Sequence, residues 1–194
     1  RGSHVLLADL GGDSADEIVV SGSQGEVFVL DGALNDLIDP DSDPATLDPF
    51  AVGTFDHNGV MWNQPAAAGD FDGDGIGSEL VLTGPRGLYV FTGDGGQLIP
   101  NADHAGLVVL AESCFLPPIL IPRDRTSEFH EAEPVDACVV FEISGESFLR
   151  LYHGASAQMS LEFSLGAVEV KAPPVFAWGQ VVVAVHNPIS GESQ

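Results

Sequence analysis

Three aspartates at alternate positions, Asp70, Asp72 and Asp74, carry the clearest chemistry in this sequence. Alternate side chains of a tightly wound loop can converge on one ion, and Ca²⁺ takes roughly six to eight oxygen ligands, carboxylates among them. Gly73 and Gly75 permit the positive φ angles that such a loop requires. Without a cation, three carboxylates this close repel one another. The loop therefore predicts a calcium site, with an ordinary acidic turn as the alternative.

The remaining ligands are expected from the end of the same loop. The carbonyl oxygen of Ile76 would be the next ligand, and either Ser78 or Glu79 would close the shell, because a strand is predicted from residue 79 onward. The loop is not an EF-hand, since Val81 stands where that motif has its final Glu and the flanking segments are predicted strands. Mg²⁺ fits less well than Ca²⁺, because it prefers a rigid octahedral shell with retained waters.

An earlier segment, residues 9–17, is a weaker version of this loop. Gly11 stands where the later loop has its second aspartate, so one carboxylate is missing. The segment is predicted either to bind a second calcium ion or to be a turn that keeps the same shape. Its candidate ligands are Asp9, Asp13, Asp16 and Glu17.

The two acidic loops begin a repeated unit. Residues 8–32 align with residues 69–95, with Asp9 opposite Asp70 and Glu17 opposite Glu79. Each copy consists of an acidic loop, a strand, a glycine-containing turn and a second strand. The strand segments are short and rich in β-branched and aromatic residues, and no segment has a helical period over about twelve residues. In the first copy the predicted strands are 17–21 and 27–30.

A fainter third copy follows, in which residues 137–154 repeat the strand, glycine turn and strand. We therefore predict one domain, 5–194, with units near 5–60, 61–112 and 113–171. A partial fourth unit, 172–194, should hold strands near 175–178 and 181–186. A period of about 50–60 residues with four short strands is typical of β-propeller blades. The predicted fold is all-β: a propeller-like repeat of four-stranded antiparallel blades, about three and a half in this chain.

Three and a half blades do not close a ring. Either the chain is part of a longer protein, or two copies complete each other as a homodimer, or the fold is a different one. Residues 1–4, Arg-Gly-Ser-His, resemble the remnant of a cleaved affinity tag and are excluded from the predicted domain.

The composition limits the partners. The 194 residues include 29 acidic and 6 Lys or Arg residues, a formal charge of −23, so the surface repels nucleic acid and anionic membranes. No apolar run approaches the ~20 residues of a membrane span. Cys114 and Cys138 fit no metal motif and are predicted to be either two buried thiols or a disulfide.

No catalytic motif is evident, since the sequence has neither a Gly-x-Ser-x-Gly nucleophile turn nor a glycine-rich phosphate loop. A carboxylate pair for glycoside chemistry cannot be identified from sequence alone. Four aromatic residues could form a carbohydrate-stacking platform, but such side chains more often belong to a core. They are Phe55, Trp62, Tyr152 and Trp178.

The Asp-x-Asp-Gly-Asp-Gly loop, followed by an acid and an apolar strand, resembles FG-GAP repeats, the calcium-loop blades of integrin α-subunit heads and of many bacterial surface proteins. The resemblance covers residues 5–32 and 61–95 and is weak over 113–194. In that family the loop is one residue shorter than Gly75–Glu79 makes it here. The resemblance implies a β-propeller, calcium in loops between strands, and adhesion or ligand binding outside the cell.

Together these features predict a non-catalytic, calcium-binding module of a secreted or cell-surface protein. Its ligand would be an extracellular protein or a glycan. The alternative is an accessory propeller in a polysaccharide-degrading enzyme.

Overall fold

The protein is built from β-strands throughout the part that the structure, a computed structural model, describes: residues 4–21, 27–35, 37, 66–84, 87–91, 107–109, 116–123, 134–154 and 158–186. These residues contain no helix, and so none that is long and apolar enough to cross a membrane. The strands are β1 (His4–Ala8), β2 (Glu17–Ser21), β3 (Val27–Leu30), β4 (Ala67–Gly69), β5 (Glu79–Gly84), β6 (Gly87–Phe91), β7 (Leu107–Val109), β8 (Ile119–Pro122), β9 (Val135–Ile143), β10 (Glu146–His153), β11 (Gln158–Gly166), β12 (Glu169–Val170), β13 (Val175–Ala177), β14 (Gln180–Val182) and β15 (Val185–His186).

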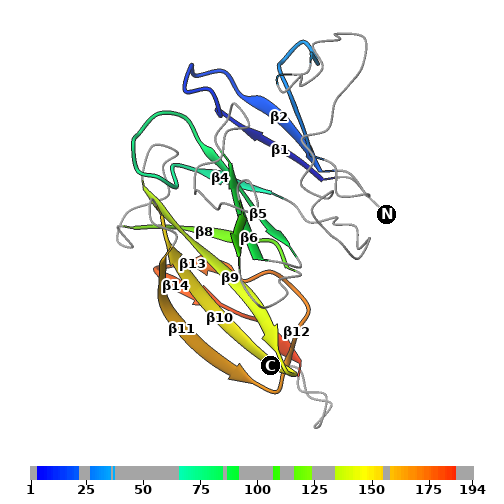
Figure 1. The fold of residues 1–194 in the computed structure, drawn as a ribbon, viewed down its shortest axis with the longest axis vertical. Coiled ribbons are helices and arrows are strands. Elements are labelled where there is room, and N and C mark those ends of the chain that lie inside the picture. The colour runs from blue at the N-terminus through cyan, green and yellow to red at the C-terminus, as the bar shows by residue number, and fades with distance from the viewer. Residues whose placement is uncertain are drawn as a thin grey trace.

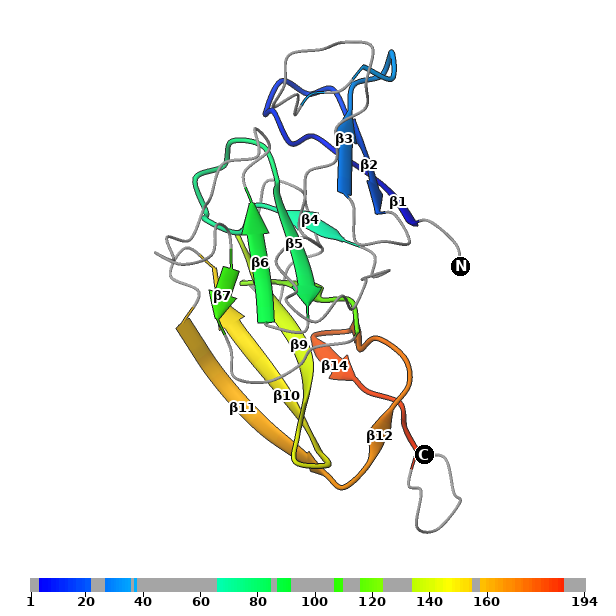
Figure 2. The ribbon, with the colours of Figure 1, turned by 45° about the vertical axis from the view of Figure 1, so that its right-hand side comes forward.

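Three antiparallel sheets follow one another along the chain, and each is a meander in which consecutive strands are neighbours. The first sheet has the order β1-β2-β3, the second β4-β5-β6-β7, and the third β8-β9-β10-β11. Figure 1 shows them in this sequence from the blue N-terminal end to the orange third sheet, and Figure 2 shows the meander of the second sheet. In the first and second sheets, the described loops 9–16 and 70–78 join the first strand to the second.

The sheets are held together by alternating apolar side chains, because successive residues of a strand point to opposite faces. On β5, Leu80 and Leu82 pack toward the first sheet, whereas Val81 packs toward the third. The contact between the first and second sheets includes Val19, Val27, Val29, Leu80, Leu82 and Phe91. The contact between the second and third sheets includes Phe71, Val81, Leu88, Val90, Val135, Ala137, Val139, Phe141 and Tyr152. The second sheet therefore buries both of its faces.

The far face of the third sheet is partly covered by the C-terminal strands. Phe176 of β13 and Val181 of β14 pack against Ile121, Cys138 and Leu151. The prediction of a single strand over residues 181–186 was wrong. The segment forms two strands, β14, which pairs with β13, and β15, which pairs with β12. The run of β-branched residues looked continuous, but the chain changes its pairing partner between Val182 and Val185.

The all-β prediction and the antiparallel four-stranded units are confirmed for the second and third sheets. The predicted strands 17–21 and 27–30 agree with β2 and β3. The closed propeller ring stays a prediction. Tyr152 belongs to the core, whereas Trp178 is 97% exposed, and Phe55 and Trp62 lie outside the described residues. Cys138 is buried on β9, and the predicted partner Cys114 also lies outside the described residues.

Candidate metal centre

The strongest candidate site is the loop that joins β4 to β5, residues 70–78. Its first residue, Asp70, follows β4 directly, and Glu79, the first residue of β5, pairs with Gly69 at the end of β4. The antiparallel register therefore places the two acids at the mouth of one turn. Gly73, Gly75 and Gly77 all have positive φ angles of 70–81°, which fold the loop back on itself.

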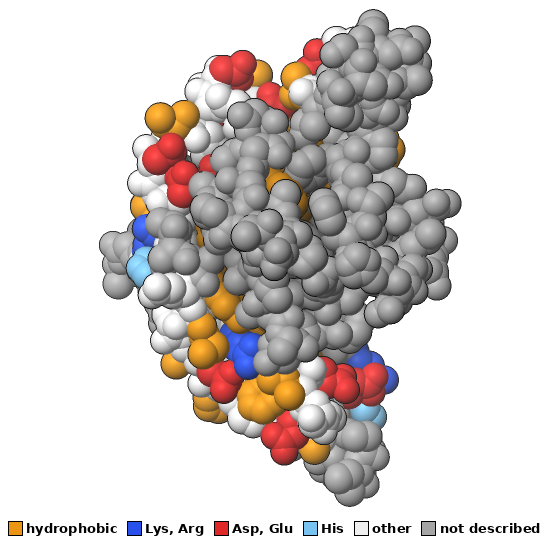
Figure 3. All heavy atoms as spheres, in the orientation of Figure 1, with side chains coloured by type: hydrophobic (Ala, Val, Ile, Leu, Met, Phe, Trp, Pro, Cys, Tyr) orange, Lys and Arg blue, Asp and Glu red, His pale blue; other side chains and the backbone are white. Residues whose placement is uncertain are grey.

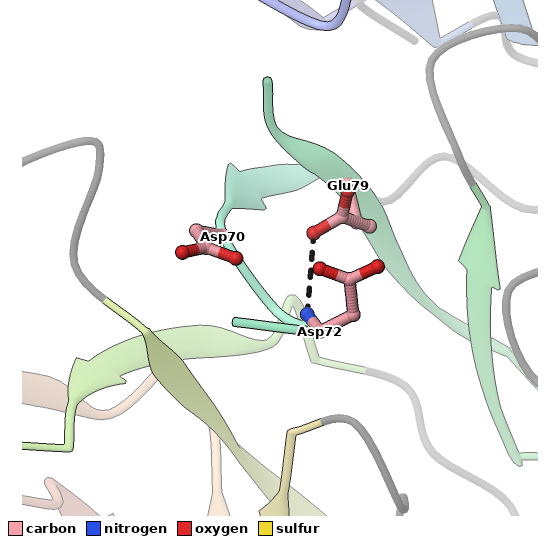
Figure 4. Close-up of side chains that lie close together, drawn as sticks. All are labelled: Asp70, Asp72 and Glu79. Carbon is pink, nitrogen blue, oxygen red and sulfur yellow. Dashed lines mark hydrogen bonds between the residues drawn. The ribbon is translucent and has the colours of Figure 1, made fainter. Parts of the chain in front are cut away.

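Three carboxylates converge in this turn. Oxygen atoms of Asp70, Asp72 and Glu79 all lie within 4.8 Å of one another. Figure 4 shows Asp70 entering from the end of β4, Glu79 from the start of β5, and Asp72 from the loop below them. Asp70 and Glu79 are 1% and 4% exposed, and Asp72 is partly exposed. This is the one group of three metal-ligating side chains among the residues that the structure describes.

Backbone N–H groups hold two of these carboxylates in place. Glu79 Oε2 accepts hydrogen bonds from the N–H groups of Phe71 (2.7 Å) and Asp72 (3.3 Å). The two oxygens of Asp70 accept from Gly73 (2.6 Å) and Gly75 (3.2 Å). Each carboxylate is thus oriented by the loop before any ion binds, which reduces the ordering that a metal would have to impose.

Electrostatics make the metal-free cluster unfavourable. Burial, with smaller contributions from the Asp72 and Asp70 carboxylates, raises the pKa of Glu79 from 4.5 to about 7 against the opposing effect of the two N–H donors. Burial also raises the pKa of Asp72, with the carboxylates of Asp74 and Asp70 adding to the effect. Buried carboxylates that raise one another's pKa values are stabilised in their charged form when a cation binds between them.

The loop that joins β1 to β2, residues 9–16, has a similar hydrogen-bonding pattern, in which the glutamate accepts from the equivalent donors and one of the two donors to the aspartate differs. Glu17 Oε2 accepts from the N–H groups of Leu10 (2.7 Å) and Gly11 (3.2 Å), as Glu79 does from the equivalent residues. The carboxylate of Asp9 accepts from Asp13 (3.1 Å) and Ser14 (2.9 Å). The alignment of Asp9 with Asp70 and of Glu17 with Glu79 is therefore confirmed by geometry.

The first loop nevertheless lacks the cluster. Its candidate ligands Asp9, Asp13, Asp16 and Glu17 do not form a group of three within the distance that joins the second loop's carboxylates. Gly11 supplies only a backbone N–H where Asp72 supplies a carboxylate as well. Whether the first loop binds a second calcium ion or is a turn that keeps the same shape stays open, with both as predictions.

The two loops touch each other. A Cβ placed on Gly77 would lie 2.7 Å from the carbonyl oxygen of Leu10, and one placed on Gly12 would lie 3.0 Å from Gly77 N. In Figure 3, acidic side chains gather at the upper left of the face in view, where Figure 1 places both loops. Gly77 belongs to the second loop, which is longer than the first. The longer loop thus provides a surface that contacts the first loop.

The six predicted ligands of the second loop divide into two groups. The Asp70, Asp72 and Glu79 carboxylates form the cluster, and the choice between Ser78 and Glu79 as the ligand that closes the shell stays a prediction. Asp74 lies outside the cluster, and its Oδ1 accepts from Ile76 N (2.7 Å). The Ile76 side chain is 67% exposed, and Ser78 is buried. Asp74 and the Ile76 carbonyl stay predicted ligands, to be tested by binding.

Sequence reasoning missed the residues that fix this loop from outside. Arg123, the residue after β8, donates from Nη2 to the Phe71 carbonyl oxygen (3.0 Å), and the N–H of Val135 donates to the Asp70 carbonyl oxygen (2.9 Å). A usable signal was present: Arg123 follows the first strand of its unit, as Asp9 and Asp70 follow theirs.

Comparisons with known proteins add no relative to these observations. No family model, curated protein or solved structure matches the chain. The functional interpretation therefore depends on the residues of the loop and on their geometry.

Proposed function

We propose that this chain is a non-catalytic, calcium-binding β-propeller module of a secreted or cell-surface protein, which mediates adhesion or the binding of a protein or glycan ligand. One observation carries the proposal: the Asp70, Asp72 and Glu79 carboxylates are gathered and largely buried in one glycine-rich turn. Three carboxylates and nearby backbone carbonyls are hard oxygen donors, which suit Ca²⁺. Mg²⁺ is a less suitable ion for such a loop, because it demands a near-ideal octahedral shell and retains several waters.

Calcium would act as a structural ion. The loop connects β4, an edge strand of the second sheet, to β5, and that sheet is packed on both faces. An ion that neutralises the cluster would stabilise the entry into β5 and, through it, both sheet contacts. A ligand that binds only the folded state stabilises it by mass action, by about 2.7 kcal/mol at a concentration 100 times its Kd.

Thermal unfolding with and without calcium tests the proposal. For a chain of this size, about 2.7 kcal/mol corresponds to a rise in Tm of roughly 5–10 °C. We expect wild-type protein to show such a rise relative to protein in chelator, and Asp72→Asn to lose most of it. The control is Asp31→Asn, which replaces a partly exposed aspartate that lies outside the cluster and accepts hydrogen bonds from the N–H groups of Ala33 and Asn35. A wild-type Tm that is the same in calcium and chelator would refute the proposal.

The ligand-binding part of the proposal is supported by exposed apolar surface. Strand β11 exposes Met159, Leu161 and Phe163, each at least half accessible, and Trp178 projects from the turn between β13 and β14. Apolar side chains are visible over the third sheet in Figure 3. Exposed apolar patches of this kind often mark binding surfaces. Glycan and protein arrays, probed with and without Trp178→Ala, would identify a ligand class.

The ring-closing homodimer is part of the same proposal. Three stacked sheets leave an outer face at each end of the stack, and Val5 and Leu7 on β1 are exposed at the N-terminal end. Light scattering of the purified chain measures its mass in solution. A strict monomer at high concentration would contradict closure by a second copy and leave the calcium proposal unaffected.

A further inference from the structure

The metal loop is fixed by the third sheet as well as by its own turn. Val135, the first residue of β9, donates its N–H to the Asp70 carbonyl oxygen at 2.9 Å. The Arg123 guanidinium donates from Nη2 to the Phe71 carbonyl oxygen at 3.0 Å. The consecutive carbonyl groups of Asp70 and Phe71 are thus held by the neighbouring third sheet. Arg123 lies 52 residues after Phe71 in the chain.

Arg123 is itself held in a defined orientation. Its Nε lies 3.3 Å from Asp136 Oδ1, and the same oxygen accepts a hydrogen bond from Gly154 N at 3.1 Å. A Cβ on Gly154 would collide with both the guanidinium and the Phe71 carbonyl oxygen, so the backbone there leaves room for this bridge. On its other side the guanidinium abuts Gly73, whose Cβ would lie 3.0 Å from Nη1. The planar group therefore fills a fitted gap between β9, β10 and the loop.

We propose that Arg123 is a positioning residue for the metal loop: by bridging Asp136 and the Phe71 carbonyl, it presets the separation of the Asp70 and Asp72 carboxylates and so sets the cation affinity of the cluster. The inference rests on the proposed calcium site. Its physical basis is preorganisation. Loop ordering that is completed before binding does not have to be supplied by the ion, and partners outside the ligand set commonly control metal affinity in this way.

The charge of Arg123 and its geometry act in opposite directions. A positive charge beside the cluster repels an incoming cation. Arg123→Gln would therefore remove this repulsion and the hydrogen bond that holds the loop at the same time. Lys separates the two effects, because it keeps the charge but cannot present the planar fork that reaches two acceptors at once. Arg123→Lys is therefore the informative variant.

The matched control is Arg150→Lys. Arg150 is another arginine of the third sheet, with its Nε 2.6 Å from Glu162 Oε2 and its guanidinium over the Phe141 ring, and neither partner belongs to the loop. Asp136→Asn is the second test variant, because it weakens the anchor that orients Arg123 and leaves the loop and the arginine unsubstituted. The same oxygen also contacts Gly154 N and His153 Nδ1, and the variant weakens those contacts too.

Calcium binding would be measured by calorimetry at a temperature where every variant is fully folded by circular dichroism. We expect wild-type protein to bind, Arg123→Lys and Asp136→Asn to bind about five- to tenfold more weakly, and Arg150→Lys to stay within about twofold of wild type. Eu³⁺ luminescence lifetimes in H₂O and D₂O count the waters on the bound ion. That count should rise in Arg123→Lys, since a loosened cluster leaves coordination positions to water, whereas a purely structural role would not change it.

The outcomes separate the two proposals. Wild-type affinity and an unchanged water count in both test variants would overturn the role of Arg123 and leave the calcium site standing. If Arg123→Lys does not fold, Asp136→Asn alone decides the question. Failure of the wild-type protein to bind calcium would overturn the calcium site and the role of Arg123 with it.

Discussion

The raised pKa of Glu79 gives the metal-free protein a pH dependence of stability with a defined sign. The native state holds the Glu79 proton up to about pH 7, because burial and the neighbouring carboxylates disfavour the charge, whereas the unfolded chain releases it near the ordinary value of 4.5. Between these pH values the native state binds more protons than the unfolded state. The free energy of unfolding therefore falls as the pH rises from about 4.5 to about 7.

The size of the effect follows from the same two values. Each pH unit of pKa difference corresponds to about 1.36 kcal/mol, so a rise from 4.5 to about 7 is worth roughly 3 kcal/mol. The Glu79 side chain is only 4% exposed, and solvent screening removes little of this. Glu79→Gln keeps an oxygen that can accept from Phe71 and Asp72 but cannot ionise. In chelator, the variant should gain roughly 2–3 kcal/mol over wild type between pH 5 and pH 8.

Urea unfolding of wild-type protein and Glu79→Gln at pH 5 and pH 8 measures this difference. The titrations of all other groups are common to the two proteins and cancel. Glu146→Gln, which replaces an exposed glutamate of β10, reports the general effect of removing one negative charge. With excess calcium, wild-type protein at pH 8 should regain stability and Glu79→Gln should not. If the stabilities of wild-type protein and Glu79→Gln in chelator change with pH in parallel, within about 0.5 kcal/mol, then burial and the neighbouring carboxylates do not raise the pKa of Glu79 in the folded protein.

Two further predictions concern the backbone of the acidic loops. Ser14 has a φ of +69° where the second loop has Gly75, so Ser14→Gly should raise the free energy of unfolding by about 0.5–1 kcal/mol, whereas Ser14→Ala should not, as measured by urea titration. Gly77→Ala should destabilise the protein by at least about 1 kcal/mol more than Gly75→Ala, since both have positive φ but only the Gly77 Cβ would press on the Leu10 carbonyl oxygen. Equal losses from the two alanine variants would show that the loops do not depend on their mutual contact.

Local features of the fold could be predicted from the sequence because short-range patterns determine them. The strand limits at 17–21 and 27–30 follow from β-branched residues bounded by turn residues, and the equivalence of Glu17 and Glu79 follows from the repeat. Spacing shows which side chains alternate but not how far the loop turns, so it does not indicate which of the three aspartates lie together in the cluster. Asp74 bonds its own loop at Ile76 N and lies outside the cluster.

Features that depend on distant partners could not be predicted. The division of 181–186 into β14 and β15 depends on where β12 and β13 lie, and nothing within those six residues indicates a change of partner. The contact of Gly12 with Gly77 and the bridge from Arg123 to Phe71 are also set by the stacking of the sheets. Side-chain alternation indicates that a strand has two buried faces, but it does not identify the residues that meet across them.

The residue that follows the first strand has a different role in each of the three sheets. Asp9, Asp70 and Arg123 each follow the first strand of a sheet, at the turn toward the second strand. In the first sheet a paired Asp and Glu satisfy backbone N–H groups, and in the second a third carboxylate adds negative charge that an exchangeable cation could neutralise. In the third sheet the residue at this position is itself a cation, paired with Asp136 and extended to the second loop. The Arg123 guanidinium of the third sheet thus contacts the loop of the second sheet, where the proposed ion would bind. If that proposal holds, cation affinity should depend on the neighbouring sheet as well as on the aspartates of the loop.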